Sequence, residues 1–492
     1  MEDVPGFGQS LAAERTMNSS FPIATAARGP LTRKHLLVLM GILVVCAGVR
    51  LWLIHRSDSI AKDGVIYLEM ASKWDSNPAE VAKNYAYPPG YPAAVAGVHR
   101  LVLIAGMADG RESWEWAGRA VSVVSSLAAM VAIYFLAGLT FNWPIAALTT
   151  LLFGIGKKWS CLGADALSDC LAISMQLWAT VGMLAVLSML RRGVRWAPAV
   201  AAGAGMLAGL GYLVRQESLW VIFVACTVWL GRYVIRRRNL WLTLASIVAM
   251  AAAAGAVAAP YMMTIGGLSN KKIVGRISGL ASLVGEVRTT TSVSPASTPS
   301  AAAEDEDVHT SPTALKILQQ IMAALQPIIG GFFLVGLLGL AVCRWGPGRA
   351  LGSLMPMPTN AGKALFVAAA VVVLPILALL HQTAGYVSHR HVMFLAAVLS
   401  PLATAGILWV AGMASRVGKL RRVRPELVAV ILVCVVFVCV AFDTMQYRPH
   451  RNKDHDRQAA HPCQPDRKPR QAKLWITQAG GGLCVSHWCM TG

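Results

Sequence analysis

The sequence predicts an all-α polytopic membrane protein, a bundle of about eleven transmembrane helices. Of its 492 residues, 55% are hydrophobic and only 14% are charged, whereas a soluble domain normally carries about 25% charged residues. Apolar runs of about 20 residues, each long enough to cross the hydrocarbon core of a bilayer, recur from Leu36 to Phe442. A bilayer can solvate this much apolar surface, and the interior of a soluble fold cannot bury it.

These apolar runs define the expected spans in order along the chain. A polar segment precedes the first run and no small-residue cleavage site follows it, so we expect a retained helix rather than a removed signal peptide. One or two of the runs are candidates for split or re-entrant helices. The expected spans are 36–54, 119–139, 143–156, 168–190, 196–213, 218–235, 240–262, 315–343, 364–381, 392–413 and 426–442.

Basic residues set the expected orientation. The net charge of +20 does not indicate nucleic-acid binding, because the Lys and Arg residues lie in short clusters between apolar runs, as they do in membrane proteins. A cytoplasmic N-terminus places four later clusters on the cytoplasmic side. These are Arg191/Arg192/Arg195, Arg232/Arg236/Arg237/Arg238, Arg344/Arg349 and Arg416/Lys419/Arg421/Arg422/Arg424.

This orientation predicts three regions and an external C-terminus. They are a cytoplasmic tail at 1–35, a transmembrane domain at 36–442 and an external tail at 443–492. The external loops include 55–117, with interfacial helices, and 263–314, whose Ser, Thr, Ala and Pro content is typical of a flexible segment. Most of the unusual acids, histidines and aromatics then lie on the external side.

Asp63 is the first candidate catalytic residue. It lies four residues before Tyr67, so the two share a face of a helix. A carboxylate at the membrane interface beside basic groups can stay ionised and accept a proton, but Asp also commonly caps a short helix. Both roles are open from the spacing. The nearby Tyr87-Pro88-Pro89-Gly90-Tyr91-Pro92 indicates a rigid turn, because Pro fixes φ.

Charged residues recur at the external ends of later spans. Arg215 and Glu217 lie in a very short turn, where Arg is suited to bind a phosphate, although an Arg215–Glu217 ion pair is an equal alternative. Lys157, Lys158 and Asp169, with Asp165 beside them, form either a binding surface or a solvated loop.

His389, Arg390 and His391 begin the tenth span. Cations oppose the helix dipole there, so a lipid head group or bound phosphate would explain them. A metal site is disfavoured, because residues at i and i+2 point to different faces of a helix.

Two further groups have mainly structural interpretations. The acidic run Glu304-Asp305-Glu306-Asp307 is expected to be solvated rather than to bind metal. Beyond about Ala460 the tail is basic and lacks a core pattern, and it is expected to be disordered. A truncated or frame-shifted end is left open, as is a zinc site or a disulfide among His461, Cys463, Cys484, His487 and Cys489.

Taken in order, these segments resemble the GT-C glycosyltransferases of the ArnT/PMT type (family 39-like), over roughly residues 30–455. The matching segments are Asp63, Tyr67 and Ala71, the Pro88–Pro92 turn, Arg119-Ala120-Val121-Ser122, Ala166-Leu167-Ser168-Asp169, Gly211–Glu217 and Ser388–His391. The chain departs from the family pattern at Gln216, which replaces a Pro, and at His391, which replaces a Tyr.

The resemblance implies an inverting glycosyltransferase of the cell envelope that takes a sugar from a polyprenyl-phosphate donor. Asp63 would be the general base, acting on a lipid, glycan or protein acceptor, in the external half of a bacterial inner membrane. Tyr67, Tyr87, Tyr91, Lys157, Lys158, Asp169, Arg215, Glu217, Arg390 and His391 would bind the substrates. No metal ligand is expected, although a divalent cation as cofactor is left open, and nucleic acid is not expected as a partner.

The main alternative is a transporter or lipid flippase, which would also hold charged groups within a helix bundle. Transporters usually show internal repeats with broken helices near the midplane. The sequence shows no clear repeat, and its polar groups gather at one interface, so an enzyme is favoured.

Overall fold

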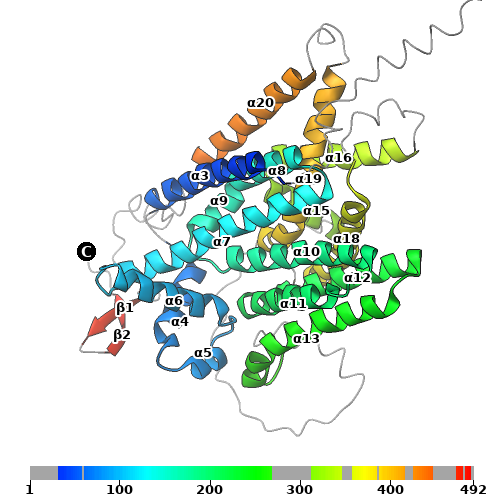
Figure 1. Cartoon of the computed structure of the whole chain (residues 1–492). Helices are drawn as coiled ribbons and strands as arrows, with labels where there is room; N and C mark the ends of the chain where they lie inside the picture. Colours follow the sequence, from blue (N-terminus) through cyan, green and yellow to red (C-terminus); the bar gives the residue numbers. More distant parts are fainter. Residues whose placement is uncertain are drawn as a thin grey trace, which may run out of the picture.

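The computed structural model describes residues 31–57, 60–268, 312–345, 357–384, 387–415, 425–446, 473–479 and 482–488. Within these ranges the chain forms a bundle of long helices with a group of shorter helices at one end (Figure 1). The N-terminal tail up to Pro30, the acidic run 304–307, and Cys463 and Cys489 lie outside the described residues.

The helices are given in chain order with their bounds. They are α3 (Arg33–His55), α4 (Lys62–Trp74), α5 (Pro78–Asn84), α6 (Gly90–Ile104), α7 (Arg111–Thr140), α8 (Trp143–Ile155), α9 (Lys157–Ala164), α10 (Asp169–Arg192), α11 (Ala197–Val214), the 3₁₀ turn η1 (Gln216–Leu219), α12 (Trp220–Arg236), α13 (Leu240–Ile265), α15 (Thr313–Leu325), α16 (Pro327–Trp345), α18 (Asn360–Ala384), α19 (His389–Ala414) and α20 (Pro425–Gln446).

The expected membrane spans correspond to helices in the structure. Among the described residues, nine helices are long and apolar enough to cross a bilayer. The two remaining expected spans are the 13-residue helix α8 and the pair α15 and α16, which bend by 117° at Gln326. The chain is therefore an integral membrane protein, and the predicted all-α polytopic fold is confirmed.

The short helix α8 still returns the chain across the bundle. The Ser122 hydroxyl, in the first half of α7, donates to the Leu167 carbonyl at 3.1 Å and accepts from the Leu167 N–H at 3.2 Å. The start of α10 therefore lies beside the first half of α7, and the two helices leave this end in the same direction. Because α7 carries the chain away from this end, α8 and α9 must bring it back.

Helix α19 lies at the centre of the bundle. It contacts α7, α8, α10, α15, α16, α18 and α20, and 94% of its most apolar window is buried. A helix that is apolar on every face is typically buried, and α19 is buried on all sides from Val392 to Leu408. Its first residue, His389, lies at the same end of the bundle as the short helices α4 to α6.

Arg50 ties three helices together inside the bundle. Its side chain is fully buried, and the guanidinium donates to the Ser126 hydroxyl at 2.6 Å and to the carbonyls of Cys46 and Gly154 at 2.8 and 3.2 Å. A charge in a membrane helix is costly unless such partners surround it. These bonds hold α3, α7 and α8 in register.

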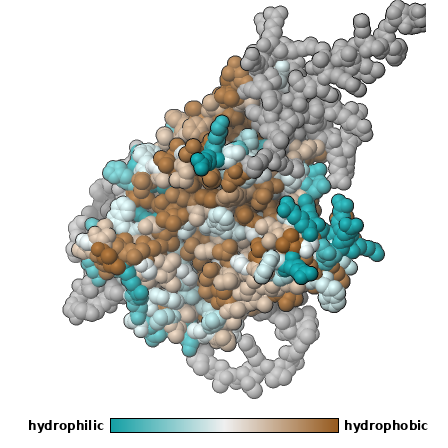
Figure 2. Space-filling model, in the orientation of Figure 1, coloured by the Kyte–Doolittle hydropathy of each residue, from teal (hydrophilic) through white to brown (hydrophobic). Residues whose placement is uncertain are grey.

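The two ends of the bundle carry different residues. The basic clusters at the end of α10 and at the α12–α13 connection lie at the end opposite the start of α10. Figure 2 shows a mostly brown, hydrophobic middle on this face, and teal residues gathered at its right edge, where α12 meets α13 in Figure 1. The short helices α4 to α6 occupy the other end, together with the start of α10.

The sequence did not indicate one element, a β-hairpin near the C-terminus. Strand β1 (Lys473–Ala479) pairs antiparallel with β2 (Gly482–Trp488). The hairpin occupies part of the tail that was expected to be disordered, and Cys484 lies opposite Thr477 in its register.

Candidate active site

The start of α4 is held against the turn that precedes α10. The Asp165 carboxylate accepts the Ala61 N–H at 3.1 and 3.3 Å, and this bond satisfies one of the free N–H groups of the first turn. A Cβ at Gly64 would lie 2.9 Å from the Ala166 carbonyl oxygen, so only glycine permits this approach. The carboxylate that caps α4 is therefore Asp165, and Asp63 is left to make other contacts.

Asp63 lies between a cation and a phenol. Its Oδ2 accepts from Arg390 Nη1 at 2.7 Å, and its Oδ1 accepts from the Tyr87 hydroxyl at 3.4 Å. The Asp63 side chain is 34% exposed, so solvent or a substrate can reach it. Burial, followed by the charge of Asp63, raises the pKa of Tyr87, which keeps the phenol protonated as a donor. Residues 327 positions apart in the chain meet here.

A second carboxylate, Asp169, lies deeper and contacts two arginines. It is 2% exposed, and its Oδ1 accepts from Arg215 Nη1 at 2.5 Å while its Oδ2 lies 3.8 Å from Arg390 Nε. Glu217 lies 3.6 Å from Arg215 Nη2. Burial alone would lower the pKa of Arg215, but the charges of Asp169 and Glu217 outweigh it and raise that pKa. The guanidinium therefore stays charged at any physiological pH.

Three tyrosines form a layer beside these charges. The ring of Tyr67 contacts the rings of Tyr87 and Tyr91 edge to face, at centroid distances of 5.0 and 5.1 Å. Tyr67 accepts a hydrogen bond from Ser168 at 2.9 Å, and burial raises its pKa above the usual range. Tyr91 is fully buried, and its hydroxyl donates to the Gly118 carbonyl. Tyr67 and Tyr91 are buried and support the ring of Tyr87. Tyr87 is the only one of these three tyrosines that is not buried.

The Pro-Pro-Gly turn brings this layer against the Arg215 turn. A Cβ at Gly90 would lie 2.6 Å from the Leu213 carbonyl oxygen, and α6 begins at Gly90. The turn after α5 and the end of α11 are therefore in close backbone contact. This contact explains why a glycine follows the two prolines.

The remaining predicted residues lie at the same end of the bundle but outside the Asp63 cluster. Lys157 is paired with Asp443 at 3.0 Å, and Lys158 follows it, half-buried, in the first turn of α9. His391 accepts the Ser388 N–H at 3.2 Å and so caps α19. Within the described part of the chain, no three His, Cys, Asp or Glu side chains converge on a point that could hold a metal ion.

Sequence reasoning missed the pairing of these residues and two supporting groups. It placed Asp63, Asp169, Arg215 and Arg390 on one side, and the only pair that it named was Arg215 with Glu217, which lie 3.6 Å apart in the structure. Asp165 as the cap of α4, and Ser168 as the partner of Tyr67, had no local signal, because each contacts a residue about 100 positions away.

Fold and site together define a polytopic membrane protein with a compact acidic and basic cluster at one end of its bundle, and solved structures share this fold. The chain is similar to the apo oligosaccharyltransferase of Archaeoglobus fulgidus, with a TM-score of 0.52 and 14% identity over 87% of this chain and 58% of that chain. The same archaeal enzyme, AglB, in complex with an inhibitory peptide and a dolichol-phosphate, gives 0.52 and 13% identity over 86% and 57% of the two chains. The chain thus spans less than two thirds of the archaeal enzyme's length.

A third solved structure is ArnT from Cupriavidus metallidurans bound to undecaprenyl phosphate, with a TM-score of 0.47 and 14% identity over 84% of this chain and 75% of that chain. No protein-family model and no curated protein sequence matches the chain. The similarity to the archaeal structures shows that the chain has the GT-C fold, as its sequence predicted.

Proposed function

We propose that the chain is an inverting membrane glycosyltransferase that moves a sugar from a polyprenyl-phosphate donor to an acceptor. The observation that carries this proposal is the position of the Asp63 carboxylate, reachable and 2.7 Å from Arg390, beside Arg215 and the buried Asp169. A base and two permanent cations at one end of a membrane bundle suit a reaction in which a proton is removed and a lipid phosphate departs.

In the proposed reaction, Asp63 accepts the proton of an acceptor hydroxyl or amine. The acceptor oxygen or nitrogen bonds to the anomeric carbon while the bond from that carbon to the phosphate oxygen breaks. The phosphate leaves with the bonding electrons, and the developing negative charge is stabilised by Arg390 and Arg215. Inversion follows because acceptor and leaving group occupy opposite faces of the sugar.

Arg390 would couple donor binding to activation of the base. Its hydrogen bond to Asp63 uses one of the five N–H donors of a guanidinium, and Asp169 Oδ2 lies 3.8 Å from its Nε, too far for a hydrogen bond. A donor phosphate would compete with the Asp63 carboxylate for Arg390, because both are anions within reach of the same guanidinium. Donor binding would therefore free Asp63 Oδ2 to accept a hydrogen bond from the acceptor.

Substrate contacts are proposed for the residues around this cluster. The polyprenyl phosphate would bind at Arg390 and Arg215, in keeping with the dolichol-phosphate named in the archaeal complex. Tyr87 is the tyrosine best placed to contact the sugar. The acceptor is a lipid, glycan or protein, and no step of the mechanism uses a metal ion.

The proposed site faces the non-cytoplasmic side of a bacterial inner membrane. The described basic clusters of α10 and α12 lie at the opposite end of the bundle, and such clusters are retained in the cytoplasm. A lipid-linked donor presented on the external leaflet would then reach Asp63 and Arg390 directly.

The test is mass spectrometry of cell-envelope glycans and glycoproteins in cells that carry wild-type protein, Asp63→Asn or no protein. We expect Asp63→Asn to lose the same glycan as the deletion, although the variant inserts normally in the membrane. Asp75→Asn is the matched control, because Asp75 lies on the same segment but is half-exposed and paired with Arg100. Unchanged glycans together with altered uptake of a solute would instead establish a transporter.

A further inference from the structure

A cavity lies between the end of α3 and the start of α7, apart from the Asp63 cluster. Its volume is about 290 Å³, at the lower limit of ligand pockets, which suits a head group rather than a whole lipid. None of its lining residues belongs to the candidate active site. They include Leu51, His55, Glu112, Glu115, Trp116 and Arg119.

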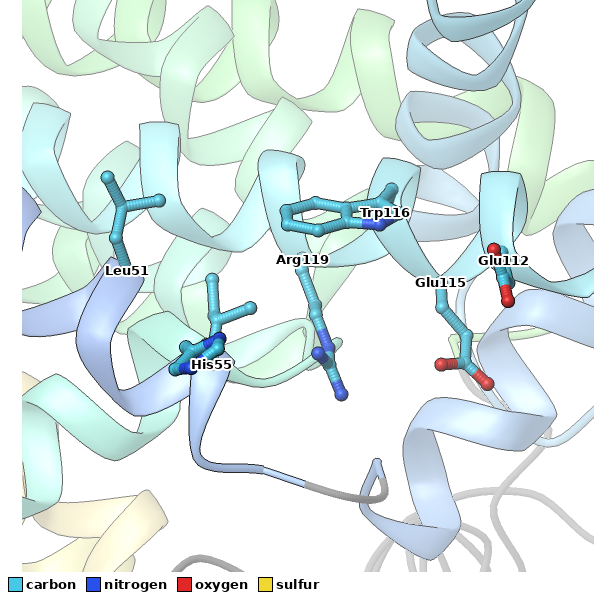
Figure 3. Close-up of a pocket in the computed structure, with 7 residues that line it drawn as sticks. Leu51, His55, Glu112, Glu115, Trp116 and Arg119 are labelled. Atoms are coloured by element: carbon cyan, nitrogen blue, oxygen red, sulfur yellow. The ribbon is translucent and has the colours of Figure 1, made fainter.

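Arg119 is the unusual residue of this cavity. Its residue exposure is only 9%, and its buried Nε has no hydrogen-bond partner among the residues that the structure describes. Figure 3 shows the guanidinium extending into the space between His55 and Glu115. Glu115 is already paired with Arg111 at 2.7 Å. A buried N–H donor without a partner carries a desolvation cost, and an anion that accepts hydrogen bonds from this guanidinium would reduce that cost.

The cavity opens where lipid is expected. It lies at the end of α3 that leads to α4, so it is at the active-site end of the bundle. Leu37, Val44 and Leu51 form a stripe at a spacing of seven along α3, with exposed fractions of 71%, 68% and 55%. Trp116 is 45% exposed, as is typical of an aromatic residue at a membrane interface. The apolar stripe therefore ends at the mouth of the cavity.

Two glutamates that line the cavity indicate that its ligand carries a positive as well as a negative group. Glu115 lies one turn before Arg119 on α7, and the exposed Glu112 lies about one turn before Glu115. Arg111 offsets the charge of Glu115, so Glu112 is the carboxylate that would most repel an anion with no positive group. A phosphodiester that also carries an ammonium group matches both charges.

We propose that this cavity binds the head group of an aminophospholipid of the outer leaflet. The phosphate accepts hydrogen bonds from Arg119, the ammonium donates to Glu112 and Glu115, and an acyl chain lies along the α3 stripe. This site is separate from the proposed donor site, and its test does not depend on glycosyl transfer.

The test is native mass spectrometry of the delipidated, detergent-purified full chain titrated with phosphatidylethanolamine, phosphatidylcholine or phosphatidylglycerol. Wild type should retain phosphatidylethanolamine most strongly. Arg119→Met should bind it about tenfold or more weakly, because charge-assisted hydrogen bonds to the phosphate are lost. Glu112→Gln with Glu115→Gln should remove the preference over phosphatidylcholine. Arg100→Met, an exposed arginine of the same end, is the matched control and should bind as wild type does.

Three results would overturn the proposal. These are equal binding of phosphatidylethanolamine by wild type and Arg119→Met, stronger binding of phosphatidylglycerol, or complete displacement of the lipid by millimolar inorganic phosphate. Arg119→Lys guards against misfolding, because it keeps the charge but lacks the bidentate fork and should still bind several-fold more weakly than wild type.

Discussion

Replacement of Asp169 by Asn removes one negative charge from the buried centre of the candidate site while nearly preserving the volume of the side chain. Asp169 is 2% exposed and is bonded to Arg215 at 2.5 Å, with Arg390 at 3.8 Å. The neutral amide still fills the space, so no cavity forms. The variant instead removes the negative charge that balances the guanidinium groups of Arg215 and Arg390.

The size of the destabilisation depends on the acidic partners that Arg215 and Arg390 keep in the variant. Removal of one partner of a buried ion pair typically costs about 3–5 kcal/mol. Glu217 remains 3.6 Å from Arg215, and Asp63 remains 2.7 Å from Arg390, so neither cation loses every acid. We therefore expect the lower limit, a loss of about 3 kcal/mol in the free energy of unfolding.

Thermal unfolding of the detergent-purified protein measures the effect. Asp169→Asn should unfold well below wild type, and Glu217→Gln should stay close to it, because a partly exposed pair at 3.6 Å contributes about 1 kcal/mol or less. Arg215→Met added to Asp169→Asn should restore part of the lost stability, since the cation that has lost its closest acid is then absent. If Asp169→Asn and Glu217→Gln unfold at the same temperature, the electrostatic reasoning is wrong.

Two further predictions concern the turn and the phenol beside the proposed base. Gly90→Ala should lower the free energy of unfolding by about 1–3 kcal/mol, because the new Cβ would lie 2.6 Å from the Leu213 carbonyl oxygen. The control is Gly97→Ala in the same helix, which should be neutral or stabilising because no atom lies within 4 Å of its new Cβ. Equal thermal unfolding of the two variants would contradict the close contact at Gly90. Tyr87→Phe should slow sugar transfer only about fivefold, because its hydrogen bond to Asp63 is long, at 3.4 Å, and contributes about 1 kcal/mol. The measurement is kcat/KM with a lipid-linked donor. A decrease in kcat/KM as large as that of Asp63→Asn would show that Tyr87 has a different role.

The helices could be predicted from sequence because apolar length and charge placement are local properties. The 23-residue helix α3 (Arg33–His55) contains the whole run 36–54, and its signal depends on no other part of the chain. The bend at Gln326 was different. Gln326 precedes Pro327 and has a φ of 68°, so the helix breaks at this dipeptide. The sequence allows for one or two split helices, but neither composition nor apolar length gives the 117° angle.

The candidate site could be predicted only as a set of residue types on one side. Orientation by charge placed Asp63, Asp169, Arg215 and Arg390 at the same interface, and the structure brings them together. Asp63 and Arg390 are 327 positions apart in the sequence. Their pairing therefore depends on how α4 packs against the start of α19, which no local sequence signal gives. The cavity at Arg119 was missed for the same reason, because a motif match does not reveal whether a guanidinium has a partner.

The position of Arg390 connects the fold to the proposed chemistry. Arg390 is the second residue of α19, and α19 is buried on all sides from Val392 to Leu408, so its first turn has little freedom to move. Asp63 is placed by a different device, the Asp165 cap and the close approach at Gly64. Two independently fixed elements thus present a base and a cation to each other at 2.7 Å. A phosphate that binds between Asp63 and Arg390 would have to separate this ion pair. It would not have to order the two helices, because their packing already fixes them.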